Sequence, residues 1–126
     1  MSKTAAIKRA SLLAALATTA ISGAPAASSS GNEKLTELTI HYAGTNVALV
    51  RTTNVVAQVN RPGCHQTWFD RHYMFDVSTS KGKAMFSQLT AAYLAGYSVV
   101  LQGGANCTTA GGDVVETLTG VRMYNF

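Results

Sequence analysis

The stretch KGKAMFSQLTAAYLAG, residues 81–96, carries the clearest helical pattern in the chain. Its apolar residues recur at three- and four-residue spacing, which is typical of a helix that faces a core. This apolar stripe consists of Met85, Phe86, Leu89, Ala92 and Tyr93. Residues 78–80 are candidate N-caps, and Gly96 fits the left-handed position that ends a helix. We therefore predict one amphipathic helix from about Lys81 to Ala95.

Strand patterns lie on both sides of this helix, either as alternating apolar and polar residues or as short runs of β-branched and aromatic residues. The predicted strands are Leu38–Tyr42, Val47–Thr52, Tyr73–Val77, Tyr97–Leu101 and Val114–Phe126, the last with a bulge at Gly120. Residues Val55–Val59 either extend the second strand or form a separate short one. This order predicts an α+β fold that is mainly β. The apolar stripes are all buried if a five- or six-stranded antiparallel sheet curls into a partly open barrel capped by the helix. A flat sheet with the helix on one face is the alternative.

The first 26 residues have the features of a secretory signal peptide. Three positive charges lie between residues 3 and 9, and residues 10–21 are apolar or small. This apolar run is shorter than the ~20 residues that span a bilayer. The small residues at 24–26 form a cleavage pattern, so we predict a cut after Ala26. The expected product is secreted or periplasmic and has no membrane span.

Cleavage would leave about 100 residues, which is the size of a single domain. The polar residues 27–35 predict a flexible lead-in, and residues 36–126 the domain itself. The whole chain has a net charge of +4, but three of its ten Lys and Arg residues lie in the signal, which leaves seven against six Asp and Glu. The remaining positive residues are scattered, whereas nucleic-acid surfaces cluster them. A nucleic-acid partner is therefore not expected.

Two cysteines, Cys64 and Cys107, remain in the mature chain. An isolated pair in an oxidising compartment is usually a disulfide, so we predict that they are bonded. The sequence NRPG at 60–63 is the strongest turn signal and leads directly into the first cysteine. The glycine pairs at 103–104 and 111–112 bracket a predicted polar loop that holds the second.

The segment from Cys64 to Cys107 resembles a pattern in small exported bacterial proteins. The residues that carry the resemblance are GKAMFSQLTAAYLAGYSV at 82–99 and GANC at 104–107. The pattern is similar to the helix and following strand in the B subunit of subtilase-type AB5 toxins. The resemblance implies an OB-like barrel with a helix over one end, and a disulfide from the region before the helix to the loop after the next strand. The toxin subunits bind sialylated glycans as pentamers, but none of their sugar-contacting residues matches a position here.

The stretch after Cys64 combines aromatic rings with planar hydrogen-bonding groups, a mixture that suits sugar or protein recognition. The candidate binding residues are His65, Gln66, Trp68, Phe69, Arg71 and His72. The alternative for Trp68 is a packed anchor under the loop. A binding surface of this kind predicts an exported, non-catalytic domain for a glycan, a protein or another copy of the chain.

Two other functions remain open at this point. A structural or accessory envelope protein could use an edge strand, with Val114–Phe126 as the candidate. A small hydrolase or metal-dependent enzyme would need His65, Asp70 and His72 to converge in space. No nucleophile elbow, H-E-x-x-H, P-loop or carboxylate dyad is present, so no cofactor or metal is expected.

Overall fold

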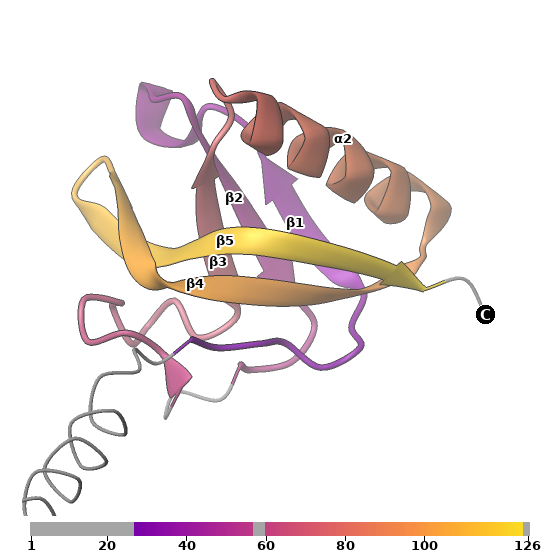
Figure 1. The fold of residues 1–126 in the computed structure, drawn as a ribbon, viewed down its shortest axis with the longest axis horizontal. Coiled ribbons are helices and arrows are strands. Elements are labelled where there is room, and N and C mark those ends of the chain that lie inside the picture. Colours follow the sequence, from indigo (N-terminus) through magenta and orange to yellow (C-terminus); the bar gives the residue numbers. More distant parts are fainter. Residues whose placement is uncertain (1–26, 57–59, 125–126) are drawn as a thin grey trace, which may run out of the picture.

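The structure is a computed structural model that describes residues 27–56 and 60–124 (Figure 1). The elements are β1 (Leu35–Thr39), the 3-10 turn η1 (Tyr42–Gly44), β2 (Val47–Thr52), β3 (His72–Asp76), α2 (Ser80–Ala95), β4 (Ser98–Ala110) and β5 (Asp113–Tyr124). This confirms the predicted class, mainly β with one helix. The predicted signal peptide lies outside the described residues.

The five strands form one sheet in the order β1-β2-β3-β5-β4. Neighbouring strands are antiparallel except β3 and β5, which pair in parallel at Met74 and Thr117. The prediction of a sheet that is antiparallel throughout is therefore wrong. The reason is the connection through α2: the chain returns as β4, reverses in a hairpin, and runs as β5 in the direction of β3. Because β1 and β4 are the outer strands, the sheet is not closed, and the proposed edge strand β5 is an interior strand.

Strand β4 is longer than the sequence predicts, because it continues through Gly103 and Gly104 to Ala110. The expected polar loop around Cys107 is thus a strand paired with β5, with irregular register between Gln102 and Cys107. The two glycines are not hinges: a Cβ on either would overlap a side chain of β5. The second glycine pair does form a turn, since Gly111 and Gly112 have φ values of 59° and 85°.

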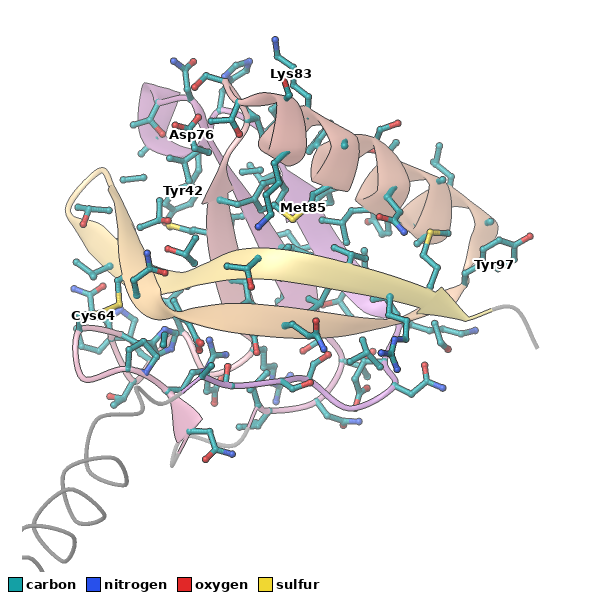
Figure 2. The ribbon with its side chains drawn as sticks, viewed as in Figure 1. Tyr42, Cys64, Asp76, Lys83, Met85 and Tyr97 are labelled. Atoms are coloured by element: carbon teal, nitrogen blue, oxygen red, sulfur yellow. A yellow bond between two sulfur atoms is a disulfide. The ribbon has the colours of Figure 1, made fainter. Side chains whose placement is uncertain are left out.

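Helix α2 begins and ends where the sequence predicts. The Thr79 side chain accepts a hydrogen bond from the Gly82 N–H at 3.0 Å, and Gly96 has the left-handed φ of 71°. Figure 1 shows α2 lying over one face of the sheet, and Met85 points from it toward the strands in Figure 2. Tyr93, predicted in the core stripe, is 46% exposed instead. Among the described residues, α2 included, no helix has the length and apolarity to cross a membrane.

Two apolar clusters pack on opposite faces of the sheet. The larger one lies beneath α2 and is built around Val50, Phe75 and Leu89. The smaller one includes Leu49 and Met74, which are the next positions on β2 and β3 and therefore face the other way. Burial on both faces explains why the sequence of β2 is a nearly continuous apolar run.

Residues 28–33 are bonded along β4 rather than being a flexible lead-in. Hydrogen bonds join the Ser30 N–H to the Leu101 carbonyl at 2.8 Å and the Gly103 N–H to the Ser28 carbonyl at 2.8 Å. Ser28 is only 3% exposed. The segment runs below β4 in Figure 1.

Two smaller predictions about the strands need correction. The first strand ends at Thr39 rather than Tyr42, because His41 and Ala43 take left-handed φ values of 57° and 52° that turn the chain. Ile40 is consequently exposed. In the segment predicted to continue the second strand, residues 55 and 56 are not strand, and residues 57–59 lie outside the described part of the chain.

Candidate functional site: an exposed tryptophan over a buried ion pair

The single tryptophan of the chain projects from residues 60–71, which precede β3 and are called the Trp68 loop below. Trp68 is 68% exposed. This excludes the packed anchor that the sequence left open. The adjacent Phe69 is half-buried and packs against the smaller apolar cluster, its ring centroid 6.3 Å from that of Trp68. One aromatic ring thus holds the loop down while its neighbour faces solvent.

Three attachments fix the Trp68 loop to the β4–β5 hairpin. The Gln66 N–H donates to the Val114 carbonyl, and the Val114 N–H donates to Gln66 Oε1, both at 2.9 Å. The Glu116 N–H donates to Nδ1 of His65 at 2.9 Å. The predicted disulfide between Cys64 and Cys107 is present, and Figure 2 shows Cys64 beside the hairpin. An irregular segment is therefore held on two strands.

A buried polar cluster lies beneath the loop and consists of Ser28, Arg61, His65, Tyr73 and Glu116 (the buried cluster). Nη1 of Arg61 lies 3.3 Å from Oε1 of Glu116, and these side chains are 2% and 0% exposed. The Glu116 carboxylate also accepts from the backbone and hydroxyl of Ser28. The Ser28 hydroxyl is 2.6 Å from the Tyr73 hydroxyl. The Glu116 carboxylate of β5 therefore joins residue Ser28 of the N-terminal segment to Arg61 of the loop. Strand β3 is linked to the same cluster through the Tyr73 hydroxyl.

Burial dominates the electrostatics of this cluster. It lowers the pKa of Arg61 from its ordinary value, although Tyr73 and Glu116 oppose the shift. Burial also raises the pKa of the Tyr73 hydroxyl. The guanidinium carbon of Arg61 lies 4.4 Å from the centroid of the Tyr73 ring, a cation–π contact. Nε and Nη2 of Arg61 have no hydrogen-bond partner among the described residues, so the Tyr73 ring, Glu116 and the His72 carbonyl, which accepts from Nη1 at 2.9 Å, supply much of the stabilisation of this charge.

Gly103 provides the space for the buried carboxylate. A Cβ at this position would overlap the carboxylate of Glu116, which its partners hold in place. We expect Gly103→Ala to lower the free energy of unfolding by about 1–3 kcal/mol through overpacking, measured by urea denaturation. Gly63→Ala is the matched control, since a Cβ there has no atom of the described residues within 4 Å apart from its two chain neighbours. Equal stability of the two variants would contradict this explanation of Gly103.

The six predicted binding residues divide into those that face outward and those that hold the loop. Trp68 is exposed and Arg71 half-exposed, with Nε of Arg71 4.0 Å from the Asp70 carboxylate. His65, Gln66 and Phe69 are instead committed to contacts with β5 and the core. The sixth, the half-buried His72, meets the ring of Phe69 edge-on at 5.3 Å.

The contacts of His65 leave neither of its ring nitrogens free for the acid–base role that a hydrolase built on His65, Asp70 and His72 would need. Both ring nitrogens of His65 are occupied by backbone groups, and His65 is buried. Burial lowers the pKa of His72, whose Nδ1 has no hydrogen-bond partner in the part of the chain that the structure describes. Within residues 27–56 and 60–124, no three His, Cys, Asp or Glu side chains are grouped so that they could hold a metal ion.

The buried cluster was not predicted from the sequence. Glu116 directly follows the two valines at 114 and 115, and a charge beside such an apolar pair was a possible signal. Arg61 was interpreted only as part of a turn, and Ser28 as part of the lead-in. Nothing in the sequence pairs residues so distant, because Ser28 and Glu116 are 88 positions apart.

A separate apolar groove of about 700 Å³ lies between α2 and the chain that follows β1. Its walls include Ile40, Phe86 and Leu94, with Lys83 as the one fully charged side chain in the lining. None of the six predicted binding residues lines it. The Trp68 loop and the groove are thus independent surface features.

The fold and the site together describe a mainly β domain with one helix. A surface loop of this domain is braced by a disulfide and presents an exposed tryptophan. Comparisons with protein families, curated proteins and solved structures gave no match to this chain. The resemblance to toxin B subunits therefore stays a prediction.

Proposed function

We propose that this chain is an exported, non-catalytic domain that binds a glycan through the Trp68 loop. The observation that carries the proposal is the exposed indole on a loop whose backbone is held by β5 and by the disulfide. The apolar C–H face of a sugar ring stacks on such an aromatic surface, and a loop already fixed in position loses little conformational entropy on binding. Asp70 and Arg71 follow Trp68 by two and three positions in the sequence and supply hydrogen-bonding groups.

The strand arrangement supports an OB-like fold for this domain. A sheet of five strands with one helix between β3 and β4 is consistent with the OB-like barrel that the resemblance implies. A barrel closes when its outer strands meet, and residues just before β1 are bridged to β4 at Ser29–Gln102 and Glu33–Val99. These bridges support a partly open barrel.

Export is part of the same proposal. The N-terminal sequence has the charge, apolar run and cleavage pattern of a signal peptide. The disulfide is consistent with an oxidising compartment such as the periplasm or the cell exterior.

A glycan array probed with the mature, oxidised protein tests the function, after light scattering has given the mass of the species in solution. We expect Trp68→Ala to weaken retention on the array at least tenfold, which corresponds to the loss of about 1.4 kcal/mol of binding free energy. Tyr93→Ala is the matched control, because Tyr93 is an exposed aromatic residue on α2, away from the loop. Its retention should equal that of the wild-type protein.

Folding of both variants is checked by circular dichroism and urea denaturation. A folded Trp68→Ala protein that binds the array as the wild type does would disprove the role of the loop. A wild-type protein that binds no glycan would disprove the glycan proposal itself.

A further inference from the structure

The two ring nitrogens of His65 have partners that fix the position of its proton. The Glu116 N–H can only donate, so Nδ1 of His65 must accept, at 2.9 Å. The Phe69 carbonyl can only accept, so Nε2 must carry the hydrogen, at 3.1 Å. The imidazole is therefore held as the neutral Nε2–H form. Its Nδ1 is the side of the ring that contacts β5.

A second proton on Nδ1 would point directly at the Glu116 N–H. Two donors would then face each other, the hydrogen bond would be lost, and a buried backbone N–H would be left without a partner. The charges around the ring do not favour an imidazolium. Arg61 of the loop and His72 of β3 both oppose a positive charge on His65. The Glu116 carboxylate on β5 favours this charge, but it is already bonded to Arg61 and Ser28. Protonation therefore disfavours the closed position of the loop.

We propose that His65 is a proton-operated latch, which releases the Trp68 loop from β5 in acid and so weakens ligand binding there. The loss of ligand rests on the proposed function, whereas the opening of the loop does not. Release would not detach the loop, since the Cys64–Cys107 disulfide keeps it tethered to β4. The Gln66–Val114 hydrogen bonds are the nearest attachments that opening would break.

The direction of the pH effect follows from the two states of the ring. Burial, and then the Arg61 charge, hold the pKa of His65 below its ordinary value of 6.5 in the closed loop. A released ring is solvated and regains the higher pKa, so the open form binds more protons. The closed position of the Trp68 loop is therefore fully favoured at a pH above the ordinary histidine pKa. This preference is lost as the pH falls through the lower pKa that His65 has in the closed loop.

Amide hydrogen exchange on the mature, oxidised protein without ligand tests the latch. Rates are corrected for intrinsic exchange and compared from about pH 7.5 to about pH 4.5, on either side of the ordinary histidine pKa. We expect protection at the Gln66, Val114 and Glu116 amides to fall by up to about tenfold per pH unit between the ordinary histidine pKa and the lower pKa of the closed form, and to level off below the latter. Amides between β2 and β3 should keep their protection, which separates loop opening from unfolding.

Two variants assign the effect to one ring. His65→Asn places an amide oxygen where Nδ1 accepts and cannot titrate, so its loop protection should no longer depend on pH. His72→Asn removes the neighbouring histidine and should leave the acid response intact. An acid response that survives in His65→Asn, or that disappears in His72→Asn, would overturn the latch.

A further readout covers the case in which His65→Asn fails to fold. The ¹⁵N chemical shifts of the wild-type imidazole at neutral pH should show hydrogen on Nε2 alone. A ring that carries its hydrogen on Nδ1, or that titrates at the ordinary pKa with no change in loop protection, would also overturn the proposal. Loop opening without any glycan binding would leave the latch intact and refute only the proposed function.

Discussion

Replacing Arg61 by methionine is expected to lower the free energy of unfolding by about 3–5 kcal/mol, since one partner of a buried ion pair is removed. The Glu116 carboxylate would stay 0% exposed with no opposite charge, while methionine keeps much of the volume over the Tyr73 ring. Urea denaturation followed by circular dichroism measures the change. A loss of this size is a large part of the stability of a typical small domain.

Arg71→Met is the matched control for this substitution. Arg71 pairs with Asp70 at 4.0 Å, and both side chains are well exposed, at 38% and 41%. An exposed pair of this kind contributes about 0–1 kcal/mol. Adding Glu116→Gln to Arg61→Met should recover part of the loss, because it removes the unpaired charge. Equal destabilisation by Arg61→Met and Arg71→Met would show that burial does not set the strength of the Arg61 pair.

Replacing both cysteines by serine is expected to lower the free energy of unfolding by about 4 kcal/mol on the chain-entropy model. The reason is the sequence separation of 43 residues between Cys64 and Cys107, which the disulfide closes in the unfolded chain. Urea denaturation of the oxidised wild type and the double variant measures the effect. Reducing agent should destabilise the wild type and leave the double variant unchanged. Coincident unfolding curves for the two oxidised proteins would contradict the prediction.

The elements with local signals were predicted well. Helix α2 has a capping threonine, a spaced apolar stripe and a terminal glycine, and all three act within a few residues of one another. Strand β2 lies at the predicted Val47–Thr52, where turn residues flank a short apolar run, although the extension that the sequence also allowed is not strand at residues 55 and 56. Such signals depend on nearby residues alone, and they remain valid in the folded protein.

The features that were missed depend on contacts between distant residues. Gly103 and Gly104 have the same local signature as a loop hinge, and only the side chains of β5 show that they belong to a strand. The parallel pairing of β3 with β5 depends in the same way on where the hairpin lies.

The site was predicted in part for the same reason. Its aromatic loop could be recognised, but the exposure of Trp68 could not, since Trp68 and Phe69 are adjacent and either ring could have packed inward. Glu116 was missed because a charged residue in a strand usually faces water.

The bond between Ser28 and Glu116 also bears on how the chain folds. It closes almost the whole length of the described chain, and contacts of such long range are associated with slow folding, because loop-closure entropy must be lost before the contacts form. In N-to-C synthesis, Ser28 emerges 88 positions before Glu116. Residues 28–33 must therefore wait without their partner strand until β4 has appeared, since Ser30 and Leu101 are 71 positions apart.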